Sequence, residues 1–122
     1  MTDLRPFELG HPRTELRRKL VAAVLAGKKT STAGLAEPGE AAPEPGTRYV
    51  LNDYDDEPVA IVEVTEASIL PARKIDLRFA QDEGEGFESV EDWRAAHERF
   101  FEQEIRPDTA IAAIRFRVVE RL

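Results

Sequence analysis

The chain has 122 residues, 42% of them hydrophobic and 34% charged, with a formal net charge of −7 and no cysteine. These values predict one folded domain over residues 1–122, argue against a protein that coats nucleic acid through phosphate contacts alone, and exclude disulfides, thiolate metal sites and cysteine nucleophiles. Because the sequence has neither a long apolar run nor a leader pattern at its start, we expect a cytoplasmic location and no membrane partner.

The first predicted element in chain order is an amphipathic helix over residues 16–25, where apolar residues recur at helical spacing. Gly27 then stands where a left-handed residue ends a helix, and the next two lysines, Lys28 and Lys29, suit the negative end of the helix dipole. Residues 33–47 contain three prolines and three glycines and are predicted to form one long loop. Such loops often border a functional site in a small domain.

The middle of the chain predicts a β-hairpin, because residues 48–53 and 57–66 are rich in β-branched and aromatic side chains around a short polar turn. Residues 75–84 predict a short helix that begins at Asp76 and ends at Gly84. A second helix follows a capping pattern at Ser89 and has one apolar face formed by Val90, Trp93, His97, Phe100 and Phe101.

The last segment, residues 110–122, alternates apolar residues with Arg115 and Arg117 and predicts a half-buried strand. Strands and helices in this order lack the rhythm of parallel β-α-β units. We therefore expect an α+β fold around a small twisted sheet or barrel.

Metal and acid-base patterns are weak in this sequence. His11 and His97 lie far apart, and neither has a metal ligand at helical spacing, so we expect no metal site and no cofactor. His97 is interpreted as a packed or capping residue and not as a general base. Glu83 and Glu85 form either an acid/base pair or part of a solvated loop, and spacing alone favours the solvated loop.

The stretch AGKKTSTAG, residues 26–34, combines two lysines with three hydroxyl side chains. A lysine held in a low-dielectric pocket has a depressed pKa and can act as a base, and a threonine hydroxyl needs such a base to become a nucleophile. Lys29 and Thr32 are three residues apart, so a regular strand would point them to opposite faces and a turn would bring them together. The spacing leaves both arrangements open.

From about Leu9 to Val119 the sequence resembles the ASCH family, small domains related to the RNA-binding PUA fold. The resemblance lies in five segments in the same order: AAVLAGKKTSTAGL, EPVAIVEVTE, FAQDEGEG, VEDWRAAHERFFE and IRFRVV. Each segment alone is a weak signal, and together they make a chance match improbable. The resemblance implies a PUA-like β-barrel of about five or six strands flanked by helices, with a cleft between the lysine segment and the EGEG region.

Some bacterial ASCH proteins are amidohydrolases that remove the acyl group from N4-acetylcytidine. They use a lysine and a threonine of a Gly-x-Lys-Thr-x-Thr segment and a later glutamate, which correspond by resemblance to Lys29, Thr32 and Glu83. The implied partner is a modified nucleoside or single-stranded RNA. We expect further contacts to the substrate from Lys28, Thr30, Ser31, Glu85, Trp93, Arg115 and Arg117. The longer 33–47 loop and the helix with Trp93 and His97 depart from the short hydrolase pattern.

The alternative is an RNA-binding module or ribonuclease, because other ASCH members are described in these terms and family membership does not decide the activity. Residues 13–29 hold six basic residues and one acid, which permits a local basic patch on an acidic body. Tyr49 and Tyr54 would stack on unpaired bases. The phosphate contacts would come from Arg17, Arg18, Lys28, Lys29, Arg115 and Arg117.

Overall fold

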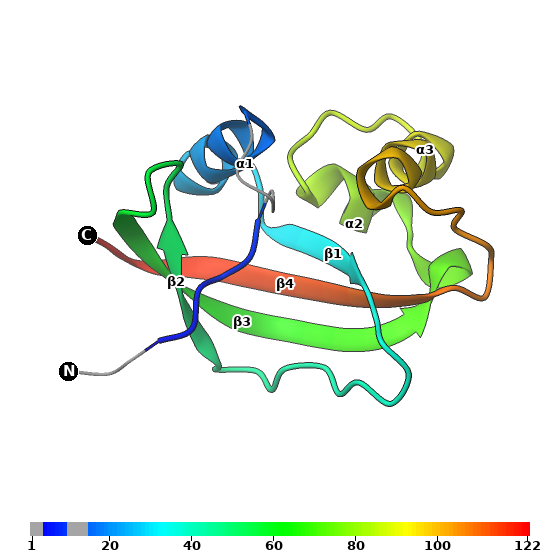
Figure 1. Cartoon of the computed structure of the whole chain (residues 1–122), viewed down its shortest axis with the longest axis horizontal. Coiled ribbons are helices and arrows are strands. Elements are labelled where there is room, and N and C mark those ends of the chain that lie inside the picture. Colours follow the sequence, from blue (N-terminus) through cyan, green and yellow to red (C-terminus); the bar gives the residue numbers. More distant parts are fainter. Residues whose placement is uncertain (1–3, 10–14) are drawn as a thin grey trace.

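The computed structural model of the protein describes residues 4–9 and 15–122, and one antiparallel sheet is its centre (Figure 1). The sheet has four strands in the order β1-β4-β3-β2. The strands are β1 (Ser31–Leu35), β2 (Arg48–Asn52), β3 (Pro58–Pro71) and β4 (Ala110–Arg121). Bulges interrupt the pairing of β3 with β4, and such irregularities bend a sheet and allow it to curl.

The sheet forms a curled half-barrel, so the predicted α+β class is confirmed, but the described strands are fewer than the five or six expected. Residues 36–47 between β1 and β2 contain three prolines, which have no N–H to donate to a strand ladder. The N-terminal segment adds only a single parallel bridge, between Pro6 and Val50. The barrel is therefore open in the part of the chain that the structure describes.

Within residues 4–9 and 15–122, three α-helices and a short 3-10 turn accompany the sheet. They are α1 (Glu15–Leu25), η1 (Ala72–Lys74), α2 (Leu77–Asp82) and α3 (Val90–Phe101). The predicted caps are present: the Asp76 carboxylate accepts from the Phe79 amide at 2.8 Å, and the Ser89 hydroxyl accepts from the Asp92 amide at 3.0 Å. Gly27 has φ +77°, the left-handed value expected after α1. None of the described helices is long and apolar enough to cross a membrane.

The predicted loop over residues 33–47 is wrong at its start, because residues 33–35 belong to β1 and pair with β4, for example Ala33 with Ala113. Ala33 and Gly34 carry little strand signal of their own, and the edge of β4 supplies the hydrogen bonds that extend the strand. The strand predicted over residues 57–66 also continues to Pro71, again along β4.

Two apolar cores pack against the sheet. One packs α1 and the N-terminal segment on β2, β3 and β4 through residues such as Phe7, Val24 and Leu51. The other packs α2 and α3 on β4 through residues such as Trp93 and Ile111. Figure 1 shows α1 at one end and α2 with α3 at the other, with β1 running from α1 toward the second group. The space between the two cores receives the candidate site.

Candidate functional site

The end of α1 determines where the two neighbouring lysines point. The amides of Lys28 and Lys29 both donate to the Ala23 carbonyl, at 2.9 and 3.1 Å, so the chain reverses directly after Gly27. Lys28 is left exposed on the outside, whereas Lys29 turns inward and is only 2% exposed. A residue this long and positively charged is rarely buried without a partner.

That partner is Glu83, which caps the C-terminus of α2 and is 1% exposed. The Nζ atom of Lys29 lies 3.6 Å from Oε1 of Glu83 and donates to the Glu83 backbone carbonyl at 3.3 Å. Two hydrogen bonds hold α2 against the start of β1: the Thr30 amide donates to the Asp82 carbonyl, and the Ser31 hydroxyl donates to the Phe79 carbonyl. The fold thus places the lysine and the carboxylate side by side from segments far apart in sequence.

Helix α3 supplies two more contacts to the same carboxylate. The indole Nε1 of Trp93 donates to Oε2 of Glu83, and Nε2 of His97 lies 3.2 Å from Oε1. Trp93 and His97 are four residues apart, so they lie on one face of the helix, and their rings stack with centroids 4.5 Å apart. From the sequence, His97 was predicted to be a packed or capping residue. Its four-residue spacing from Trp93 was the only sequence signal that linked these two side chains.

The electrostatics of the cluster follow from burial and charge. Burial is the largest influence on Lys29 and lowers the pKa of its amine, although the negative charges of Glu83 and Glu85 oppose it. Burial also acts to lower the pKa of His97, but the hydrogen bond and negative charge of Glu83 outweigh it, and that pKa is raised. The Lys29 amine therefore loses its proton more easily than a free lysine, and the His97 imidazole holds its proton more strongly than a free histidine.

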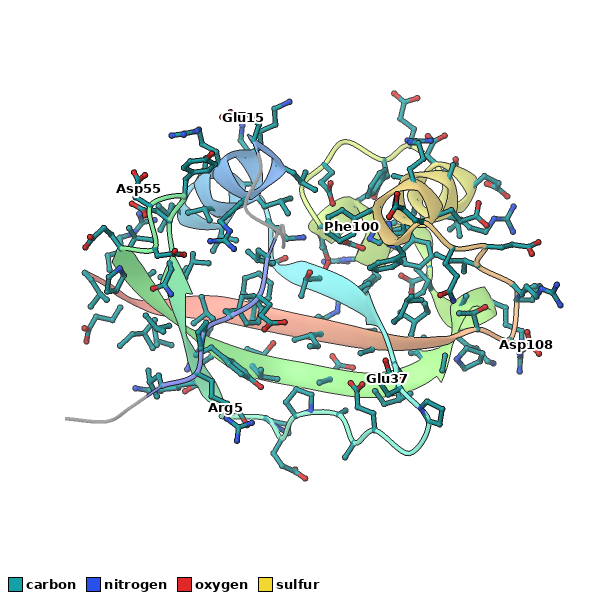
Figure 2. All side chains as sticks on the ribbon, viewed as in Figure 1. Arg5, Glu15, Glu37, Asp55, Phe100 and Asp108 are labelled. Carbon is teal, nitrogen blue, oxygen red and sulfur yellow. The ribbon has the colours of Figure 1, made fainter. Side chains whose placement is uncertain are left out.

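A cleft with a volume of about 390 Å³ opens above this cluster. Its polar lining consists of Lys29, Thr32, Glu83 and His97, and its apolar lining consists of Leu9, Leu16, Leu20, Ala33, Ala96 and Phe100. Charged side chains at its exposed edge are Glu8, Glu85 and Arg99. Figure 2 shows Phe100 extending from α3 toward the side where α1 lies. The arrangement offers an apolar slot with a buried polar end.

Glu85 lies at the mouth of this cleft, two residues after Glu83. Its residue surface is exposed, yet the cleft walls desolvate the carboxyl enough to raise its pKa, against the attraction of Lys29. The structure thus brings Lys29, Thr32, Glu83 and Glu85 to one cleft, with Trp93 buried beneath Glu83. Among these, Thr32 lies on β1, and Lys29 lies between the turn at residues 26–27 and the start of that strand.

Six predicted substrate contacts do not line the cleft: Lys28, Thr30, Ser31, Trp93, Arg115 and Arg117. Lys28 and Thr30 are exposed elsewhere, and Ser31 is buried against α2 through its hydroxyl. Arg115 pairs with Asp82 at 2.7 Å, and Arg117 pairs with Glu63 at 3.0 Å. Both arginines lie on β4. The ion pair of Arg115 connects this strand to α2, and that of Arg117 connects it to β3.

The basic residues that the RNA hypothesis requires are also largely engaged within the protein. Arg17 pairs with Asp56 at 2.9 Å, and its side chain is only 15% exposed. The Arg18 guanidinium lies over the Tyr54 ring at 4.4 Å, and Tyr49 packs against Phe7. Groups held in this way are less available for phosphate contacts or base stacking, so the described surface gives this hypothesis less support than the cleft gives a small ligand.

Glu83, Glu85 and His97 also form a group of possible metal ligands, with one donor atom from each within 4.8 Å of the others. This group was not predictable from spacing, because its members come from a helix end, a loop and a second helix. A divalent cation here would need the unprotonated Nε2 of His97, which the raised pKa disfavours. It would also compete with Lys29 for the same Glu83 oxygen.

The chain belongs to the ASCH domain family, because the sequence profile of that family matches residues 8–120. This confirms the resemblance and assigns the protein to a family of PUA-like fold. An ASCH domain from Lactobacillus crispatus JV V101 has 26% identity and a TM-score of 0.79, over 95% of this chain and 79% of its own.

Other solved structures extend the likeness. Protein EF3133 from Enterococcus faecalis V583 has 26% identity and a TM-score of 0.84, over 99% of this chain and 79% of its own. The hypothetical protein PH0355 has 17% identity and a TM-score of 0.64, over 85% of this chain and 94% of its own, which shows the fold alone. No curated protein matches the sequence.

Proposed function

We propose that the protein is an amidohydrolase that removes the acyl group from an N4-acylated cytidine-type nucleoside. The observation that carries this proposal is the buried pair of Lys29 and Glu83, with 3.6 Å between Nζ and Oε1, at the polar end of an open cleft. Burying a charged pair costs free energy, and a chain that keeps one beneath a cleft is a candidate for acid-base chemistry.

The shape of the cleft suits such a substrate. Its volume of about 390 Å³ lies in the range of small-molecule sites. The exposed Phe100 ring and the leucines of α1 offer apolar surface for a nucleobase, and the polar cluster would face its exocyclic amide. The family resemblance contributes the particular substrate class, because it assigns Lys29, Thr32 and Glu83 to acyl transfer.

The proposed reaction begins with attack of an oxygen, from Thr32 or from a water beside it, on the acyl carbonyl carbon. The neutral amine of Lys29 accepts the proton of that oxygen, and the Glu83 carboxylate stabilises the resulting ammonium. The bond from the acyl carbon to the exocyclic nitrogen then breaks, and Lys29 returns the proton to this nitrogen. Where Thr32 is the attacking group, this step leaves an acyl-threonine ester, which a water then hydrolyses to free the Thr32 hydroxyl. By either route the products are the free nucleoside and a carboxylic acid, with one water consumed overall.

The test is hydrolysis of N4-acetylcytidine, followed by chromatographic separation of cytidine and acetate. Lys29→Met and Glu83→Gln should lower kcat/KM by about 10²–10⁴-fold, the usual contribution of a positioned acid-base group. Lys19→Met, on the exposed face of α1, and Glu88→Gln, exposed before α3, are matched controls that should retain wild-type rates. Circular dichroism of each variant separates loss of chemistry from loss of fold.

Retention of activity within tenfold in Lys29→Met would remove this amine from the mechanism. The alternative activity is tested by titrating a labelled single-stranded RNA at two salt concentrations, since each neutralised phosphate makes binding weaker as salt rises. Tight, salt-sensitive binding without turnover of any acylated nucleoside would favour an RNA-binding role over the proposed one.

A further inference from the structure

His97 has two hydrogen-bonding contacts that together identify its protonation state. Its Nδ1 atom lies 2.8 Å from the Trp93 carbonyl oxygen, and a carbonyl can only accept, so Nδ1 carries a proton. Its Nε2 atom lies 3.2 Å from Oε1 of Glu83, and an ionised carboxylate also can only accept. With Glu83 ionised, both ring nitrogens are donors and the ring is an imidazolium.

The surroundings hold this ring in one place. His97 is 7% exposed, stacks on Trp93 and has the rings of Phe87 and Phe101 at centroid distances of 5.9 and 5.7 Å. A cation among aromatic rings is attracted by their π faces. A ring that is both packed and doubly hydrogen-bonded cannot rotate without losing both contacts.

The charged groups that share the cleft with His97 come from several segments. Glu83 ends α2 and Glu85 follows it, Lys29 precedes β1, Arg99 lies on α3, and Glu8 belongs to the N-terminal segment. Among these groups, Glu83 forms an ion pair with the imidazole, and the charge of Glu85 also favours the protonated ring. Lys29 faces the same Glu83 oxygen as His97 does.

We propose that His97 is a positioning residue: its Nε2 donates to Oε1 of Glu83 while the Trp93 indole donates to Oε2, and these two contacts keep the carboxylate directed at Lys29. This inference rests on the proposed function, in which Lys29 exchanges its proton with the substrate. Groups that orient a reacting side chain through hydrogen bonds commonly change activity by about 10–100-fold when removed. His97 thus acts through Glu83 and not on the substrate.

Two substitutions separate positioning from packing. His97→Phe keeps an aromatic ring but has no donor, and it should lower kcat by about 10–100-fold with little change in KM. His97→Gln can place an amide N–H near the position of Nε2 and should restore most of that loss. Circular dichroism checks that both variants fold. Equal activity in wild type and His97→Phe, or a loss in KM alone, would overturn the inference.

The pH profile provides a second readout. Loss of the His97 proton removes a donor from Glu83, so wild-type kcat/KM should fall as the pH rises through the raised pKa of His97. His97→Gln cannot titrate and should lack this fall while it keeps the rest of the profile. An unchanged profile in His97→Gln would show that the ring only fills space.

The ion pair can be measured without any substrate. The chain has two histidines, so a His11→Ala variant leaves His97 as the single imidazole in a ¹⁵N nuclear magnetic resonance titration. We expect both ring nitrogens protonated near neutral pH, and a fall of the pKa toward the ordinary value of about 6.5 in Glu83→Gln. A neutral ring near pH 6, or a pKa unaffected by Glu83→Gln, would overturn the inference. If the titration succeeds but no acylated nucleoside is hydrolysed, the proposed function fails and the hold of His97 on Glu83 stands.

Discussion

Gly84 is the point where α2 and the lysine segment come closest, and its replacement tests the geometry of the site. Gly84 has φ +74°, and a Cβ added to it would lie 2.7 Å from the Lys28 carbonyl oxygen and 3.0 Å from the Lys29 amide nitrogen. Both neighbours are backbone atoms and cannot rotate away. Gly84→Ala must therefore push the two segments apart by about 0.5 Å or more, because protein interiors are closely packed.

The expected magnitude has two parts, which a matched control separates. A side chain in the left-handed region costs about 1–2 kcal/mol, and this applies equally to Gly86, whose φ is +82°. Crowding adds about 1–3 kcal/mol at Gly84. It adds nothing at Gly86, where an added Cβ would meet no atom within 4 Å. Gly84→Ala should thus lose about 2–5 kcal/mol of unfolding free energy and Gly86→Ala only about 1–2 kcal/mol.

Urea unfolding measures this difference through the midpoints of the two variants, compared at equal slopes. The same displacement should weaken the contact between Lys29 and Glu83, and shifts approaching 1 Å near reacting groups can cost about 10²-fold in rate. Gly84→Ala should therefore lose deacylation activity even at urea concentrations too low to unfold it, whereas Gly86→Ala should retain this activity. Equal losses of stability in the two variants would refute the close approach as the constraint on this site.

Three further outcomes test neighbouring features. Ser31→Ala removes the buried hydroxyl bonded to the Phe79 carbonyl and should lower the unfolding free energy by about 1–3 kcal/mol. Thr30→Ala changes an exposed side chain and should lower it by less than about 0.5 kcal/mol. Similar values for the two variants would contradict a stabilising hydrogen bond between β1 and α2. The raised pKa of His97 means that its charged form stabilises the fold fully below about pH 6.5, and this stabilisation is lost as the pH rises through the folded pKa. The unfolding free energy of wild type relative to His97→Gln should therefore fall above that pH, and a constant difference would argue against the ion pair. Excess chelator should leave Tm and turnover unchanged, because the Lys29 amine already occupies the Glu83 oxygen that a metal ion would need. Stabilisation by Zn²⁺ that a chelator reverses would instead reveal a metal site.

Elements governed by short-range interactions were predictable from the sequence. The amphipathic spacing of α1, the capping side chains of Asp76 and Ser89, and the left-handed Gly27 involve residues within a few positions of one another. Their free energies depend on local backbone geometry, so a pattern of residue types is enough to indicate them. The order of strands and helices indicated the α+β class, and the family resemblance named three candidate residues.

The tertiary structure decided what depends on partners distant in sequence. Residues 33–35 became a strand because β4 offered a free edge, and Glu83 met Lys29 across 54 positions because two hydrogen bonds hold α2 against β1. His97 contacts Glu83 only because α3 packs beside the pair of Lys29 and Glu83. Burial set the acid-base character of the cluster, since desolvation depends on everything packed around a charge and no local pattern records it.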